Sequence, residues 1–329
     1  GLLSVLLSWL SIEIINNGFT IIEKFIAYQT ELFSSNVAGH EQPFYYHFVV
    51  VFLGCFPISI LALPALLKRR WDTPLNLNTW MLCLFWGVLI LFSIVTTKII
   101  HYSSMTWVPL SFVAALVLYK ASKGEYEFQK SLRFLFLSVG IAIGLAITAI
   151  PLILMNKEWL LSITENKYAY DSIAQTIPWS GYEITAGILF VLGTAVSFVF
   201  LKKNSITSFI ASITTTTTLV LLCIQLLILP KVEKITQGTA VTFYKELQGE
   251  NCYVECYGFK SYAHYFYFQQ PYGLAPEQKT TNWLVNGEID KPVYLITKSD
   301  NNELEQWPQF RRIMEKGGFR MYKRQIESE

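Results

Sequence analysis

Three side chains that can bind or protonate a ligand, Lys98, His101 and Tyr102, lie within five residues of one another. They occupy a short polar segment between two long apolar runs. An ionisable group beside hydrocarbon is costly to keep, so such a cluster is a functional-site candidate. An ammonium flanked by hydrogen-bonding side chains is suited to a phosphate. The sequence leaves one alternative open, because a lysine at a helix end also extends to lipid headgroups.

A second polar and aromatic segment, 39–46, opens another apolar run and contains His40. Its ordinary role would be that of a solvated loop histidine. The aromatic residues that follow it fit an interfacial belt. If both segments lie on one face of a membrane, His40 can join Lys98, His101 and Tyr102 in one site.

The composition is that of a membrane protein. Hydrophobic residues make up 52% of the chain and charged residues 15%, and the mean hydropathy is +0.36, whereas soluble domains carry about 25% charged residues. The net charge of +2 gives no indication of nucleic-acid binding. Because the sequence has no Walker loop, GxGxxG, HExxH or GxSxG motif, a soluble nucleotide-using enzyme is unsupported.

Apolar runs long enough to cross a bilayer, about 20 residues each, predict an α-helical polytopic membrane domain over residues 1–230. Segment 18–38 has helical apolar spacing and is expected as an interfacial helix. The chain opens in an apolar run without a start methionine, so we expect a fragment of a longer protein. The predicted spans are 1–15, 44–67, 80–97, 104–119, 131–155, 183–201 and 206–229.

Lysine and arginine in the short connections set the expected orientation. They concentrate after the 44–67, 104–119 and 183–201 runs, which share one face when the spans alternate. That face is expected to be cytoplasmic. Both polar segments and everything after Pro230 are then extracytoplasmic, and the protein is placed in a bacterial inner membrane.

The tail, 231–329, differs in character and predicts a small extracytoplasmic α/β domain. Strand-like alternation covers 252–257, 293–297 and 319–324, and a helix is expected over 303–316, ended by two glycines. Cys252 and Cys256 lie on one predicted strand about 13 Å apart, too far for a disulfide. No metal site is predicted, because no nearby pair completes a tetrahedral set.

Acids in the outer loop 156–182 have two interpretations. Glu158, Glu165 and Asp171 are suited either to positioning a sugar or to solvating the loop. Solvation is the favoured interpretation.

The polar segments resemble a known family. His40, Pro43, Phe44 and Tyr46, followed by Gly54 and Pro57, are similar to the H-x-x-P-F-x-Y…G-x-x-P pattern of ArnT-like bacterial glycosyltransferases, in the dolichyl-phosphate-mannose–protein mannosyltransferase superfamily. Lys98 and Tyr102 match the K and Y of that family's K-L-P-x-Y-x-L-P segment, and Pro109 lies downstream. Ile100 stands where the family has proline. The resemblance covers 1–230 well and the tail only in kind.

This resemblance implies a GT-C fold and an integral-membrane glycosyltransferase. Such an enzyme moves a sugar from a polyprenyl-phosphate donor to a lipid A-like or protein acceptor, on the extracytoplasmic face. It implies a donor-lipid site of Lys98, Tyr102, His40 and His101. The family's catalytic acid is expected upstream of this fragment, so no catalytic residue is assigned. No cofactor is certain, and a divalent metal is possible.

Two other classes of protein remain as alternatives. One is a transporter or flippase of a lipid-linked substrate without transferase chemistry. Transport would favour inverted repeats and polar residues at mid-span, and the sequence shows neither clearly. The other is a membrane anchor that displays the tail to partners, which leaves the polar cluster unexplained.

Overall fold

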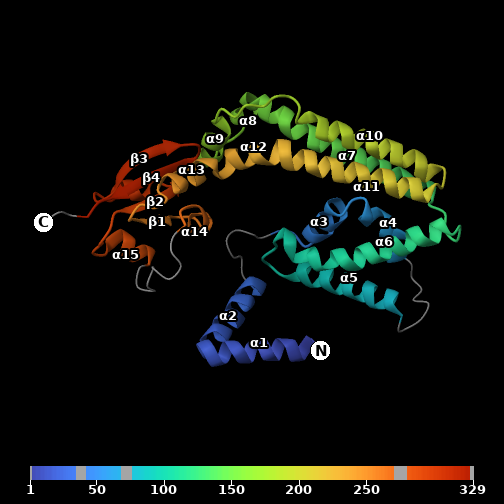
Figure 1. The fold of residues 1–329 in the computed structure, drawn as a ribbon, viewed down its shortest axis with the longest axis horizontal. Helices are drawn as coiled ribbons and strands as arrows, with labels where there is room; N and C mark the ends of the chain where they lie inside the picture. The colour runs from blue at the N-terminus through green and yellow to red at the C-terminus, as the bar shows by residue number, and fades with distance from the viewer. Residues whose placement is uncertain (1, 35–41, 68–75, 270–279, 327–329) are drawn as a thin grey trace. The chain divides into compact units, whose positions relative to one another are not determined.

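The computed structural model describes residues 2–34, 42–67, 76–269 and 280–326. It divides into two compact units, and we describe each by itself (Figure 1). Unit 1 comprises Gly1–Ile143 and Phe190–Thr216. Unit 2 comprises Gly144–Leu189 and Thr217–Glu329.

Unit 1 is helical. Its α5 and α6 pack together, α4 packs on α6, and α3 packs on α5. A 3-10 helix, η1, leads directly into α6 and contacts α3 and α5 as well. The elements are α1 (Leu2–Asn17), α2 (Thr20–Ser34), α3 (Tyr46–Gly54), α4 (Ile58–Leu66), α5 (Leu77–Ile94), η1 (Ile100–Thr106) and α6 (Trp107–Ser122).

The interval predicted as one span over 44–67 contains two helices. α3 and α4 are bent by 118° at a short break, where Pro57 follows Phe56. Proline lacks the backbone N–H that would continue a helical ladder. The pair therefore forms either a broken span or a re-entrant loop.

Three long helices follow, whose residues are shared between the two units: α7 (Lys130–Met155), α10 (Ile184–Lys202) and α11 (Ile206–Cys223). Within unit 2, α10 approaches α7 closely at Gly187. A Cβ atom there would collide with the carbonyl oxygen of Gly144 and with Thr148. Small residues at such contacts allow membrane helices to approach, as is common in bilayers.

One arginine links two connections of unit 1. Arg133 donates from Nη1 to the carbonyl oxygen of Lys202 at 3.2 Å and from Nη2 to Asn204 Oδ1 at 3.3 Å. The same Nη2 pairs with Glu127 at 2.8 Å. The α6–α7 and α10–α11 connections therefore meet at one end of the bundle, as the charge pattern predicted for the basic loops.

One helical stretch, shared between the two units, is much longer than a membrane span requires. The helical stretch Ile206–Glu246 is 41 residues long and passes through Pro230, where a domain boundary was predicted. After α11 it comprises the π-helix η2 (Ile224–Ile228), α12 (Leu229–Glu233), the π-helix η3 (Lys234–Gly238) and α13 (Thr239–Glu246). Two short helices, α8 (Lys157–Ser162) and α9 (Lys167–Ala174), lie in the connection between α7 and α10, and α9 contacts η3.

A four-stranded sheet of order β1-β2-β4-β3 ends the chain (Figure 1). β1 and β2 are parallel, and the other two pairings are antiparallel. One apolar cluster packs α13 on the sheet, and a second packs α15 on it. The elements are β1 (Tyr253–Cys256), α14 (Ala263–Tyr267), α15 (Thr281–Asn286), β2 (Val293–Lys298), η4 (Glu303–Gln306), β3 (Arg311–Lys316) and β4 (Phe319–Arg324).

The predicted strands over 252–257, 293–297 and 319–324 are present, but the helix predicted over 303–316 is wrong. That interval holds the 3-10 turn η4 and the strand β3. Leu304, Trp307 and Phe310 are spaced like a helix face. Pro308 interrupts the helical ladder, and the residues after it pair with β4 instead.

Among the described residues, five helices are long and apolar enough to cross a membrane, or six if the bent pair counts as one span. They coincide with the predicted spans from residue 80 onward. The fold class is therefore confirmed: a polytopic α-helical membrane protein with a small C-terminal α/β sheet domain.

Candidate functional site

Lys98 is buried between α5 and η1. The residue is only 6% exposed. Its ammonium donates one hydrogen bond of 2.7 Å to the carbonyl oxygen of Val95. An ammonium has three hydrogens to donate. Within the described part of the chain, two of them are left for a ligand.

His47, in the first turn of α3, is the second buried polar group of this site. It is fully buried, and neither ring nitrogen has a hydrogen-bond partner among the described residues. Lys98 lies close enough to act on it electrostatically. Because buried polar atoms are nearly always paired, His47 is a candidate residue for binding a polar group.

Phe92 of α5 connects this histidine to the predicted tyrosine. Its ring centroid lies 6.4 Å from that of His47 and 5.4 Å from that of Tyr102 in η1. The contacts of α3, α5 and η1 thus bring His47, Lys98 and Tyr102 to one end of unit 1. We call these three residues the Lys98 site.

The other two predicted residues differ. His101 is exposed and stands edge-on to Tyr102 at 5.7 Å between ring centroids, so it borders the Lys98 site rather than lining its buried part. His40 lies outside the described residues. The sequence alone did not single out His47, which lies at the start of the apolar run after the 39–46 segment. Only the structure shows that its ring is buried and close to Lys98.

A second polar site, in unit 2, joins Glu183 at the start of α10 to Lys231 of α12. Glu183 is 1% exposed. Its Oε1 accepts a very short hydrogen bond from Lys231 Nζ and others from the backbone and hydroxyl of Ser180. Lys231 also donates to the carbonyl oxygen of Pro178 and lies 5.2 Å from the centre of the Trp179 ring.

Electrostatics keep Glu183 ionised. Burial alone would raise its pKa, but the hydrogen bonds from Lys231 and Ser180 outweigh burial and lower the pKa to about 2. A carboxylate at a helix N-terminus is further favoured by the helix dipole. Sequence reasoning missed this pair. The sequence does contain a signal for it: Glu183 is the first residue of the 183–201 run, and Lys231 follows the 206–229 run.

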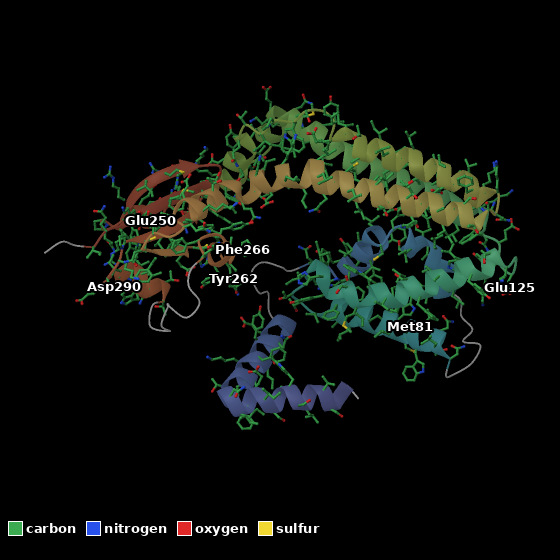
Figure 2. The ribbon with its side chains drawn as sticks, in the orientation of Figure 1. Met81, Glu125, Glu250, Tyr262, Phe266 and Asp290 are labelled. Carbon is green, nitrogen blue, oxygen red and sulfur yellow. The ribbon has the colours of Figure 1, made fainter. Side chains whose placement is uncertain are left out.

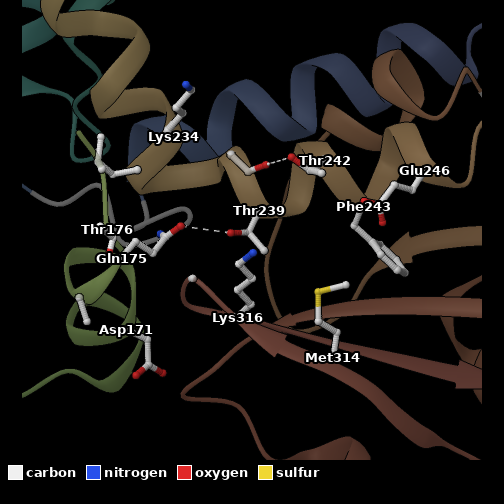
Figure 3. Close-up of a pocket in the computed structure, with 14 residues that line it drawn as sticks. Asp171, Gln175, Thr176, Lys234, Thr239, Thr242, Phe243, Glu246, Met314 and Lys316 are labelled. Carbon is white, nitrogen blue, oxygen red and sulfur yellow. Dashed lines mark hydrogen bonds between the residues drawn. The ribbon is translucent and has the colours of Figure 1, made fainter. Parts of the chain in front are cut away.

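A cavity of about 750 Å³ also lies in unit 2. α9, η3, α13 and the β3–β4 turn enclose it (Figure 3). Its lining carries two lysines, Lys234 and Lys316, and two acids, Asp171 and Glu246. The charges of these groups balance, so the cavity has no net preference for an anion.

Asp171 is held by ion pairing. It pairs with Lys167 at 2.6 Å, and Lys167 also reaches Glu315 of β3 at 3.2 Å. Burial opposes ionisation of Asp171, but the bonds from Lys167 and Ser299 outweigh burial and lower its pKa. Asp171 is therefore ion-paired within the fold, whereas the favoured interpretation from the sequence was solvation of the loop.

One group in the described residues has the composition of a metal site. Glu255, Cys256 and His264 offer a carboxylate, a thiol and an imidazole, and these ligand atoms all lie within 4.8 Å of one another. All three belong to the tail domain and lie apart in sequence from the residues of the Lys98 site.

Comparison with known proteins identifies the class of fold. The chain has the GT-C fold of ArnT-like membrane proteins. It superposes on the crystal structure of ArnT from Cupriavidus metallidurans bound to undecaprenyl phosphate, with a TM-score of 0.60 and 14% identity. The apo structure of the same protein gives 0.59 and 13%.

The two superpositions cover 96% of this chain but only 58% and 57% of the ArnT chain. The chain therefore spans somewhat more than half the length of the protein that it resembles. No model of a known protein family matches the sequence, and no curated protein matches it either.

Proposed function

We propose that this chain forms the donor-lipid part of an integral-membrane glycosyltransferase that takes a sugar from a polyprenyl phosphate. The observation that carries the proposal is the Lys98 site. Its buried ammonium makes one hydrogen bond, and the buried His47 ring makes none, among the residues that the structure describes. The fold supports it, because an ArnT structure of the same fold binds undecaprenyl phosphate.

The chemistry follows from the charge that must be stabilised. In transfer, the bond between the anomeric carbon and the phosphate oxygen breaks, and the bonding electrons stay on the phosphate. The acceptor's hydroxyl or amine forms the new bond to the anomeric carbon and gives up its proton to a base. Lys98 would stabilise the departing phosphate, and His47 and Tyr102 would hydrogen-bond to its oxygens.

The other predicted features are proposed on the same basis. The acceptor is a lipid A-like molecule or a protein, and the site faces the extracytoplasmic side of a bacterial inner membrane. His40 and His101 are proposed to border the donor site. We assign the catalytic acid to none of the described residues.

The first prediction tests the phosphate site with Lys98→Met, which removes the charge and keeps most of the side-chain volume. A hydrogen bond to a charged group contributes about 1.5–3 kcal/mol. The variant should therefore bind undecaprenyl phosphate roughly ten- to hundredfold more weakly. The measurement is the affinity of the detergent-solubilised protein, by titration of its thermal stability or by native mass spectrometry.

Lys120→Met is the matched control, since Lys120 lies in the last turn of α6 and is basic but distant in sequence from the site. It should bind the lipid like the wild type. Wild-type affinity in Lys98→Met, with the fold intact by circular dichroism, would exclude the proposed phosphate site.

A transporter or flippase of a lipid-linked substrate is the alternative function. Reconstituted vesicles that contain a labelled sugar on polyprenyl phosphate distinguish the two. Transfer of the label to an acceptor supports the glycosyltransferase. Movement of intact labelled lipid between leaflets without transfer supports transport.

A further inference from the structure

The tail domain contains a buried group of metal-binding side chains that the Lys98 site does not use. Cys256 is the last residue of the edge strand β1, and His264 lies in α14, the helix that follows. Cys256 Sγ lies 3.6 Å from His264 Nδ1. His264 Nε2 lies 3.3 Å from Glu255 Oε1.

Neighbouring residues of a strand normally point to opposite faces of the sheet. Glu255 nevertheless reaches the same place as Cys256, because its side chain folds back and its Oε1 accepts a 2.9 Å hydrogen bond from the backbone nitrogen of Cys256. A carboxylate, a thiol and an imidazole thus converge from the end of one strand and one short helix.

His264 supplies independent evidence that a ligand belongs here. It is only 1% exposed, yet its Nε2 makes no hydrogen bond among the described residues, in spite of its closeness to Glu255. By contrast, Tyr262 just before α14 and Phe266 within it are 66% and 77% exposed (Figure 2). The histidine is therefore buried selectively, with one ring nitrogen unused.

A catalytic cysteine would also place a thiol, an imidazole and a carboxylate in this order. Reactive cysteines are partly exposed and have a lowered pKa. Cys256 is 7% exposed, and burial raises the pKa of its thiol to about 11. This environment opposes a nucleophilic thiolate.

We propose that Glu255, Cys256 and His264 bind a zinc ion or a similar borderline-soft divalent cation. Thiolate, imidazole and carboxylate bind Zn²⁺ at about 2.3, 2.0 and 2.1 Å, which places ligand atoms roughly 3.3–3.8 Å apart in a tetrahedron. The 3.6 Å and 3.3 Å distances involve different ring nitrogens of His264, and a metal ion binds one of them. With one ligand atom taken from each residue, the three atoms lie within 4.8 Å of one another. A closing movement of about 1 Å would bring them to the tetrahedral spacing. The partly exposed carboxylate of Glu255, 27% by side chain, gives the ion its path of entry and leaves room for a water as fourth ligand.

Binding would release the Cys256 proton to solvent and leave the thiolate on the metal. The ion would tie β1 to α14, and α14 also contacts α13. Its expected effect is therefore on the stability of the tail domain. This inference is independent of the proposed glycosyltransferase function.

The test uses the whole protein in detergent, stripped of metal with a chelator and titrated with Zn²⁺ and, separately, Co²⁺. One equivalent should bind, raise the thermal transition and, with Co²⁺, give a thiolate-to-metal charge-transfer band in the near ultraviolet. Cys256→Ser should abolish that band. Loss of a ligand should weaken binding at least tenfold, since even groups that only support a ligand contribute 10–100-fold.

Cys252→Ser is the matched control, because Cys252 is a free cysteine just before β1 and outside the group. It should retain the band and the affinity. Glu255→Gln, at a partly exposed position, guards against misfolding of the Cys256 variant and should also weaken binding. Metal binding unchanged in both Cys256→Ser and Glu255→Gln, or absent from the wild type, would overturn the proposal.

Discussion

At the scale of single residues, the chain keeps two kinds of buried charge. Lys98 is buried with a backbone carbonyl as its partner, whereas Glu183 is buried with a full counter-ion, Lys231. A buried ion pair that loses one partner is strongly destabilised, because the remaining charge is left without compensation. We therefore propose that a bound phosphate compensates the charge of Lys98, whereas the charges of Glu183 and Lys231 compensate each other and stabilise the fold.

Acidification should reveal the contribution of Glu183. Its pKa is lowered from 4.5 to about 2 in the folded protein. Between these values the unfolded chain binds a proton that the folded chain does not, so stability is lost as the pH falls from about 4.5 towards 2. The thermal transition of the wild type should fall more steeply over this interval than that of Glu183→Gln, followed by calorimetry or fluorescence in detergent.

Glu158→Gln serves as the control, since Glu158 is an exposed acid of the same loop. It should follow the wild-type profile. Identical pH profiles for the wild type and Glu183→Gln would show that the ion pair does not stabilise the fold.

The residues of the two sites could be predicted only in part. Lys98 and Tyr102 lie close in the sequence, so their proximity follows from local spacing. His47 becomes notable only through tertiary contacts with Phe92 and Lys98, and Glu183 meets a lysine 48 residues away. Pairings over such distances depend on how helices pack, which composition and periodicity do not determine.

At the scale of elements, close helix approach in the membrane domain depends on glycine. Hydropathy located the helices well, because each span is a long apolar run with polar ends. It did not locate their bends or contacts: the break between α3 and α4 and the strand β3 both depend on a proline and on partners elsewhere in the chain.

Gly187→Val should destabilise the protein. The new side chain would meet the backbone of Gly144 and Thr148 and force α10 away from α7, a change that typically costs about 1–3 kcal/mol. Its thermal transition in detergent should be several degrees lower than that of the wild type.

Gly87 in α5 offers the comparison, because nothing lies within 4 Å of a Cβ atom built there. Gly87→Val should change the transition little. Equal effects of the two substitutions would mean that helix propensity, and not the α7–α10 contact, sets the cost.

At the scale of the whole molecule, the charge pattern and the contacts agree that the α6–α7 and α10–α11 connections lie at the same end of the helices. Arg133 joins the two basic connections at one end, and the Glu183–Lys231 pair joins the start of α10 to α12. We propose, from the positive-inside rule, that the basic connections are cytoplasmic and that the tail domain lies on the opposite side.

Single cysteines at Glu125 and Glu250, both exposed (Figure 2), test this orientation. A membrane-impermeant maleimide added to intact cells or spheroplasts should label Glu250→Cys. It should label Glu125→Cys, between α6 and α7, only after the membrane is opened. Cells that carry the unsubstituted chain measure the background from the native cysteines, and the reverse labelling pattern would invert the proposed topology.

The 41-residue helix Ile206–Glu246 determines where this polypeptide can be divided. At 1.5 Å per residue it is about 60 Å long, twice the thickness of the hydrocarbon layer. Its last turns supply Ala240, Phe243 and Tyr244 to the apolar cluster beneath the sheet. A secreted fragment that begins after residue 246 would lack part of its own interior. A water-soluble version of the sheet domain should therefore begin near residue 234 and carry the final stretch of the membrane helix with it.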